Sequence, residues 1–256
     1  MKKGLKEEVL MLVAIMFALS FCGCNSNSPE KAMTKEGDRV IENVVKDIDG
    51  NTYDAVKLGN QVWMKSNLQT VSGLTKYHLG SDFDTTVSYY DVDRNGRVFY
   101  DENTALYDNI CPEGWHVPSL SEWEELEHYM MSQEKYVCGI SNTHIAKALA
   151  DSVEWKYYLN PLPEDSINIG YNPLTTNNAS GFSAQGWGYD PIEGGKAFFE
   201  GEATRFWTST PGGSHRGLKR RFAYFIELRI DKPYIFKDDL SGMYSIRCIK
   251  DKEINN

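Results

Sequence analysis

Residues 111–124 read CPEGWHVPSLSEWE, and this stretch decides the fold because it fixes where the principal helix begins. It contains two overlapping capping boxes, Ser119 with Glu122 and Ser121 with Glu124. Apolar side chains then recur at helical spacing as far as Met130. The sequence therefore predicts a helix that starts after Pro118 and runs to about Gln133.

A shorter helix is expected from about residue 142, where Ile145, Ala148 and Leu149 share one helical face. Upstream of both helices, residues 44–53 predict a hairpin closed by Asp-Gly-Asn. Downstream, four short aromatic-rich strands are predicted, at 181–184, 205–209, 222–228 and 243–249. Helices in the middle and strands at both ends imply an α+β fold with a mostly antiparallel, twisted sheet, two helices and long loops.

The first two dozen residues have the pattern of an export signal. A basic start leads into an apolar run of 13 residues, Val9 to Phe21, which is too short to span a bilayer. The run looks like a bacterial lipoprotein leader, with Cys24 as the lipidated residue because Gly23 is small enough for the peptidase. The expected organisation is a signal peptide at 1–23, a flexible tether at 24–40 and one domain at 41–256.

Net charge and cysteine content limit the cellular environments and the binding partners to be expected. Loss of the leader removes three lysines and two glutamates, so the formal net charge changes from −9 to −10. Such an acidic chain disfavours non-specific nucleic-acid binding. We expect a lipid-anchored protein of the cell envelope, in the outer membrane. The domain has three cysteines, for which one disulfide and one single thiol is the simplest interpretation.

Short motifs follow one another along nearly the whole mature chain. They are DIDGNTY at 47–53, QVWMKSNL at 61–68, GRVFY at 96–100, CPEGWHVP at 111–118, EW at 122–123, GFSA at 181–184, FWTST at 206–210 and IRCIKD at 246–251. In sequence and order they resemble the Fibrobacter succinogenes major paralogous domain, a family of exported bacterial proteins.

The resemblance implies a scaffold similar to the C-type-lectin-like fold that formylglycine-generating enzymes share. It also implies a disulfide between Cys111 and Cys248, which would tie the segment before the main helix to the last strand and leave Cys138 as the single thiol. The resemblance implies no defined activity, and a scaffold alone does not imply function.

Four residues fit the pattern of a calcium-binding loop, D-x-[DN]-x-[DN]-G-x5-E. They are Asp91, Asp93, Asn95 and Glu102. Neither flank has a helical pattern, so an acidic hairpin turn is the preferred interpretation and calcium is the alternative. No other cofactor is expected.

Two loops are candidate binding surfaces. Residues 186–195 combine glycine with Trp187 and Tyr189, whose rings either face a sugar or protein partner or fold back onto the sheet. Residues 215–221 form a basic cluster that either binds carboxylates or sulfates or is a solvated turn. Its candidate ligand-binding residues are Arg216, Lys219, Arg220 and Arg221.

Catalytic signatures are missing from the sequence. The five histidines form no H-E-x-x-H pair, and GFSAQG at 181–186 misses the spacing of a nucleophile elbow. We therefore expect a non-catalytic protein that presents loops for binding glycan or protein. The alternatives are an oxidase of the formylglycine-generating type, with a reactive thiol at Cys138, and a purely structural envelope component.

Overall fold

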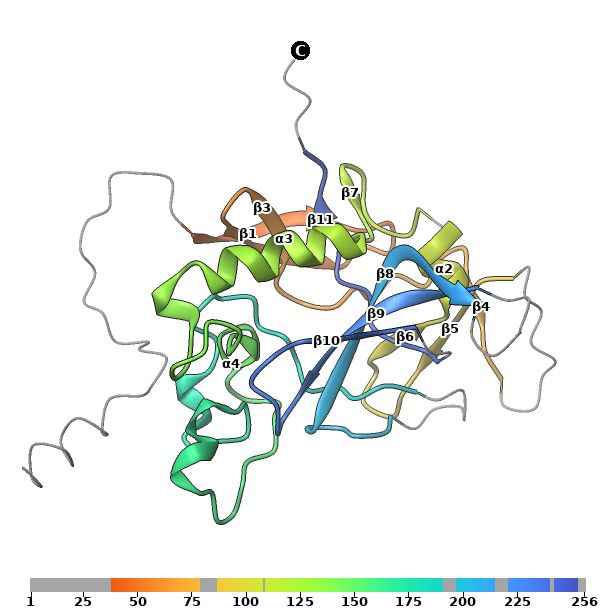
Figure 1. The fold of residues 1–256 in the computed structure, drawn as a ribbon. Helices are drawn as coiled ribbons and strands as arrows, with labels where there is room; N and C mark the ends of the chain where they lie inside the picture. Colours follow the sequence, from red (N-terminus) through yellow and green to blue (C-terminus); the bar gives the residue numbers. More distant parts are fainter. Residues whose placement is uncertain are drawn as a thin grey trace, which may run out of the picture.

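The fold is seen in a computed structural model that describes residues 38–78, 87–107, 109–190, 197–214, 221–239 and 242–252 (Figure 1). The predicted leader, Cys24 and most of the predicted tether lie outside these residues. Strand β1, Arg39–Lys46, starts two residues before the predicted beginning of the domain. Within the described ranges, no helix has the length and apolar character needed to cross a membrane.

The largest sheet has five strands in the order β1-β2-β3-β11-β7, and all of its neighbouring strands are antiparallel. Besides β1, its strands are β2 (Thr52–Leu58), β3 (Gln61–Met64), β7 (Trp115–His116) and β11 (Ile249–Lys250). The pair β1–β2 confirms the predicted hairpin. The last strand in sequence lies between β3 and β7, so the end of the domain is inserted into the sheet that its first strands begin.

Two smaller sheets complete the β structure of the described residues. One has the order β10-β9-β8 and is antiparallel, with β8 at Ala203–Ser214, β9 at Arg221–Arg229 and β10 at Phe236–Asp238. The other consists of β4 (Thr75–Lys76), β5 (Tyr89–Val92) and β6 (Val98–Tyr100), in which only β4 and β5 are parallel. The predicted α+β class with mostly antiparallel sheets is therefore confirmed.

The described part of the chain has three short α-helices. They are α2 (Glu102–Tyr107), α3 (Leu120–Met131) and α4 (Ala146–Leu149), with 3-10 turns at Glu134–Tyr136, Pro163–Ile167 and Leu174–Thr176. Helices α3 and α4 correspond to the two predicted helices, although each is shorter than expected. Helix α2 was not predicted, because six residues are too few to show a helical period.

Helix α3 begins as its capping box dictates. Ser119 is the N-cap: its Oγ accepts a hydrogen bond from the Glu122 backbone N–H, and the Glu122 carboxylate accepts one from the Ser119 N–H at 2.8 Å. The helix buries Trp123, Leu126 and Met130, which lie on one face.

The main core joins the large sheet, α3 and the β8–β9 pair (Figure 1). Trp123 of α3 lies at its centre, with ring centroids 4.6 Å from Trp63 of β3 and 5.6 Å from Phe206 of β8. Phe182 packs edge-on against Trp63 and Trp123. The EW and FWTST motifs therefore carry core residues that hold the two sheets and the helix together.

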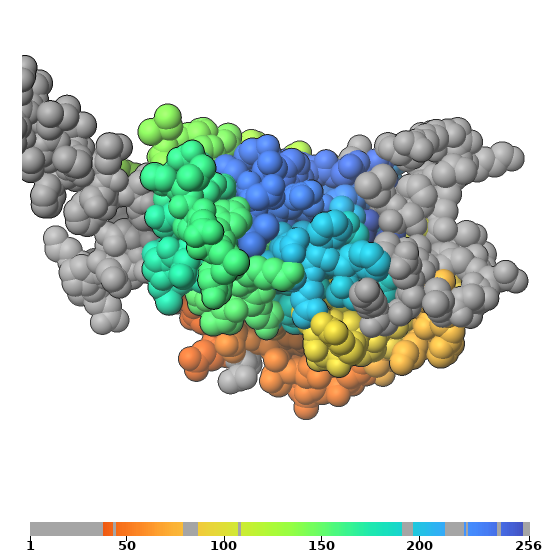
Figure 2. Space-filling view, turned by 90° about the horizontal axis from the view of Figure 1, so that it is seen from below, coloured from red at the N-terminus to blue at the C-terminus, as the bar shows by residue number. Residues whose placement is uncertain are grey.

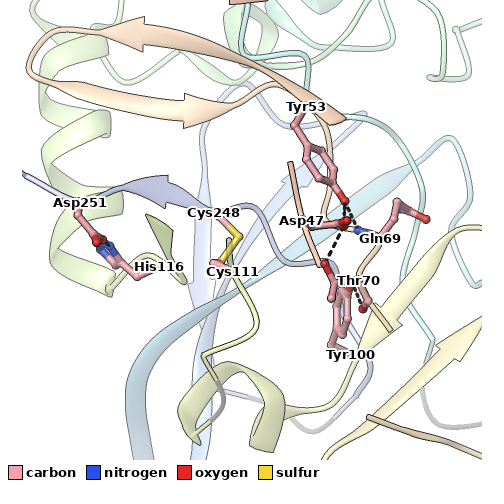
Figure 3. Close-up of a disulfide and its surroundings, with 9 residues drawn as sticks. All are labelled: Asp47, Tyr53, Gln69, Thr70, Tyr100, Cys111, His116, Cys248 and Asp251. Atoms are coloured by element: carbon pink, nitrogen blue, oxygen red, sulfur yellow. Dashed lines mark hydrogen bonds and ion pairs between the residues drawn. A yellow bond between two sulfur atoms is a disulfide. The ribbon is translucent and has the colours of Figure 1, made fainter. Parts of the chain in front are cut away.

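A disulfide links Cys111, just before β7, to Cys248, just before β11, as the resemblance implied (Figure 3). Their Cα atoms are 6.0 Å apart although 137 positions separate them in sequence. Cys138 is buried, with 3% of its surface exposed.

The predicted strand at 181–184 does not form. Gly181 and Ser183 have φ angles of +74° and +58°, which a β-ladder does not admit, and only Ala184 makes an isolated bridge, to Ala150. The predicted strand at 243–249 is likewise broken up: residues 243–245 make isolated bridges and the regular strand β11 begins at Ile249.

Candidate functional site

A groove of about 1510 Å³ opens where segments that are distant in sequence meet, on the face shown in Figure 2. It is lined by the β1–β2 turn and the β5–β6 turn (orange and yellow there), by residues 153–156 (green) and by residues 197–202 (cyan). Ser66, Asn67, Gln69 and Trp187 complete the lining. Pockets for single small molecules measure roughly 300–1,000 Å³. This groove can therefore accept an extended ligand.

The β1–β2 turn is held by the side chain of Asp47. Its Oδ1 accepts a hydrogen bond from the Asn51 N–H at 2.8 Å, and its Oδ2 accepts one from Asn51 Nδ2. The same Oδ2 also accepts from Tyr53 Oη and Thr70 Oγ1 (Figure 3). Burial opposes ionisation of this carboxyl, but the donors from Tyr53, Asn51 and Thr70 lower its pKa below the ordinary value. Gly50, at φ +90°, supplies the left-handed residue that closes the turn.

The β5–β6 turn repeats this geometry. Asp93 Oδ1 accepts from the Arg97 N–H at 3.0 Å, its Oδ2 accepts from Arg97 Nε at 2.7 Å, and Gly96 has φ +78°. In both turns the aspartate backbone N–H donates to the carbonyl oxygen four residues later, at 3.0 Å. The two Asp-x-Asp/Asn-Gly sequences are therefore equivalent hairpin turns, and both contribute to the groove.

Two of the four predicted calcium ligands, Asp93 and Asn95, lie in this second turn, and the other two lie outside it. Asp91 lies on β5, Asp93 is bonded to Arg97, Asn95 donates to Glu200, and Glu102 begins α2. Among the described residues, no group of three or more histidine, cysteine, aspartate or glutamate side chains could hold a metal ion. The hairpin interpretation is confirmed, because β5 and β6 pair in register from Tyr90–Tyr100 to Val92–Val98.

The opposite wall consists of three segments packed backbone to backbone. The Lys156 N–H donates to Gly201 O at 2.9 Å, the Gly201 N–H to Gly186 O at 2.6 Å, and the Gly188 N–H to Ala203 O at 2.8 Å. A Cβ on Gly188 would lie 2.0 Å from Phe198 O, and one on Gly186 would lie 2.6 Å from Glu154 O. Glycine is needed here so that the backbones can approach each other.

Glu200 connects this wall to the β5–β6 turn. Its carboxylate is 3.2 Å from the Arg94 guanidinium and 3.0 Å from that of Arg97, and it accepts a hydrogen bond from Asn95 Nδ2 at 3.0 Å. No sequence pattern predicts this contact, because Glu200 lies more than a hundred residues from its three partners.

Trp187, a predicted ligand-binding residue, lines the groove but is folded back, with 8% of its surface exposed. Its Nε1 donates to Glu154 Oε2 at 2.5 Å, and the Arg97 guanidinium lies 5.9 Å from its ring centroid. Burial raises the pKa of the Glu154 carboxyl, although the bond from Trp187 acts in the opposite direction. Glu154 is thus a carboxyl with a raised pKa on the wall of the groove.

Tyr189, the second predicted aromatic residue, lines a separate depression of about 180 Å³. Its ring stacks on Phe199 at 5.6 Å, and the Arg205 guanidinium lies 3.6 Å from its centroid. Phe199 lines both the groove and this depression, is 47% exposed and has φ +57°. A bulky residue in the left-handed region is a backbone outlier. No sequence pattern predicts this conformation for Phe199.

The basic cluster cannot be placed beside these residues. Arg216, Lys219 and Arg220 lie outside the described residues, and Arg221 is described only as the first residue of β9. Trp187 and Tyr189 are thus the predicted ligand-binding residues whose positions are known, and they line neighbouring concavities.

The fold and the groove together define a class of protein: an α+β domain, tied by a long-range disulfide, that presents a loop-built groove on antiparallel sheets. Residues 56–250 match the Fibrobacter succinogenes major domain, and the chain belongs to this family. Comparisons with curated proteins and with solved structures gave no match.

Proposed function

We propose that this protein is a non-catalytic, lipid-anchored component of the cell envelope that binds a glycan or a protein in the groove. The observation that carries the proposal is the groove itself, which is larger than a single small molecule needs. Loops on a rigid scaffold are where recognition residues concentrate. A C-type-lectin-like arrangement, in which disulfide-tied sheets hold long recognition loops, is part of this proposal.

The anchor in this proposal is acylated Cys24. Durable attachment needs two or more acyl chains, because one chain binds a membrane only marginally. The segment from Cys24 to β1 would then link the lipid to the domain at the outer membrane.

Two other functions have less support. An oxidase of the formylglycine-generating type would use a reactive thiol at Cys138, and that residue is buried, with 3% of its surface exposed. A purely structural envelope component would not need a loop-built groove.

The test uses the full-length chain in detergent, screened against a glycan array and against envelope proteins in a pulldown. In Val153→Trp the new ring fills the groove, because Val153 lies on its wall and is 77% exposed. The matched control is Ile140→Trp, fully exposed and outside the groove. We expect a ligand whose affinity falls at least about tenfold in Val153→Trp and is unchanged in Ile140→Trp. The absence of any ligand at millimolar concentration, or equal binding by both variants, would refute the proposal.

A further inference from the structure

The side chain of Phe199 stands on the ridge between the groove and the smaller depression, and its backbone conformation is costly. The left-handed region is unfavourable for a non-glycine residue, and such outliers persist where the surrounding structure holds them, commonly at functional sites. Here the turn is held by hydrogen bonds from the N–H groups of Glu202 and Ala203 to Phe199 O, at 2.8 and 2.9 Å.

The conformation does not serve to bury the ring. Phe199 stacks on Tyr189 with an interplanar angle of 23°, yet it remains 47% exposed, whereas Trp187 beside it is 8% exposed. The fold therefore holds a large apolar ring at the edge of a groove, where it can contact a ligand.

The charged groups that line the groove balance one another. They comprise three cations, Arg94, Arg97 and Lys156, and three carboxylates, Glu154, Glu200 and Glu202. Each cation is paired: Arg94 and Arg97 with Glu200, and Lys156 with Glu202 at 2.5 Å. The whole chain carries a formal charge of −9, so an anionic ligand would be repelled at long range and would find no net positive charge in the groove.

The rest of the lining is rich in side chains that both donate and accept hydrogen bonds. They are Asn51, Thr52, Ser66, Gln69 and Asn95. A pyranose presents the complementary surface, because its C–H face packs against an aromatic ring while its hydroxyl groups donate and accept at the rim.

We infer that the groove binds a neutral glycan of several pyranose units and that Phe199 is the ring on which one of these units stacks. This inference rests on the proposed function and specifies its ligand. Phe199 is then a residue that determines specificity for an uncharged sugar.

The experiment measures binding of neutral hexasaccharides (cellohexaose, xylohexaose and mannohexaose) and of the anionic hexagalacturonate to the full-length chain in detergent, by calorimetric titration. Phe199→Gly removes the ring and suits the left-handed φ, so the fold is retained, which near-ultraviolet circular dichroism checks. Phe199→Trp keeps an aromatic face.

We expect one neutral hexasaccharide to bind, with an affinity that changes little between about 50 and 500 mM salt because no net charge is involved. Phe199→Gly should weaken it at least about tenfold, and Phe199→Trp should stay within about threefold of the parent. Preferred binding of hexagalacturonate, capture of an envelope protein in the groove, or sugar binding that Val153→Trp abolishes but Phe199→Gly leaves intact would overturn this inference while the proposed function stands. If nothing binds in the groove, both fail.

Discussion

At the scale of the residue, His116 shows how a half-exposed side chain connects three parts of the fold. Its Nε2 is 2.9 Å from Glu122 Oε1 at the start of α3. Its Nδ1 is 2.6 Å from Asp251 Oδ1, just after β11 (Figure 3). The hydrogen bond to Glu122 raises the pKa of His116, burial opposes this, and Asp251 adds to it. Burial of the Glu122 carboxyl acts to raise its pKa, but the hydrogen bonds from His116 and Ser119 outweigh burial and lower the pKa to about 2.

The raised pKa gives the stability contribution of His116 a definite pH dependence. The contribution is fully present below the unfolded-state pKa of about 6.5 and is lost as the pH rises through the higher folded-state pKa. His116→Gln should therefore lower the unfolding midpoint at about pH 5.5 by an amount equivalent to less than about 1 kcal/mol, because the pair is partly exposed, and have little effect at about pH 9. The control is His128→Gln, at an exposed position on α3. A larger loss at pH 9 than at pH 5.5 would contradict the expected sign.

At the scale of the element, the wall of the groove depends on backbone segments that approach more closely than any side chain allows. Gly188, at φ +72°, faces Phe198 O and Glu200 N, which a Cβ would approach to 2.0 and 3.0 Å. Gly73 is also left-handed, at φ +86°, but has nothing within 4 Å of the same position. A side chain at Gly73 would therefore meet only the cost of the left-handed conformation. A side chain at Gly188 would meet the same cost and, in addition, a clash with the neighbouring backbone.

Gly188→Ala should therefore destabilise much more than Gly73→Ala. The left-handed conformation alone costs about 1 kcal/mol, the expected loss for Gly73→Ala. In Gly188→Ala a clash with the main chain is added, so the loss should exceed about 3 kcal/mol and ligand binding should weaken. Urea unfolding of both variants measures the difference. Equal losses would show that the wall relaxes and that close packing of the segments is not required.

The equivalent hairpin turns could be predicted at this scale from sequence alone. Asp47–Asn51 and Asp93–Arg97 carry the same Asp-x-Asp/Asn-Gly pattern, whose bonds are local. The prediction of a short strand at 181–184 was wrong. The composition of this segment is typical of a strand, but Gly181 and Ser183 adopt left-handed backbone conformations that a strand does not allow. Apolar composition predicts burial, and Phe182 is indeed buried, but it does not fix φ.

At the scale of the whole molecule, the Cys111–Cys248 disulfide links two positions that are 137 residues apart in sequence. It joins the segments that precede β7 and β11, two strands that pair in the large sheet. In the chain-entropy model, a loop of this length stabilises the fold by about 4–5 kcal/mol, although measured gains are often smaller.

The double variant Cys111→Ala, Cys248→Ala should lose at least about 2 kcal/mol of unfolding free energy, because the unfolded chain regains the freedom of a long loop. Chemical denaturation of the oxidised parent and of the variant measures this. The matched comparison is the parent under reducing conditions, which should approach the double variant. An unchanged unfolding midpoint would show that β11 is held in the sheet by its hydrogen bonds and packing alone.

The local features and the family could be predicted from the amino-acid sequence. The local features are the capping box that starts α3, the Asp-Gly turns, and the buried face of Trp123, Leu126 and Met130. These depend on contacts within a few residues or on the period of a single element. The groove, in contrast, is formed by tertiary contacts. Glu200 meets Arg94 and Arg97, and Gly188 meets Phe198, because chain segments that are far apart or irregular are brought together by the sheets and the disulfide. Contacts of this kind leave no periodic trace in the sequence, since they depend on the path of the backbone rather than on residue type.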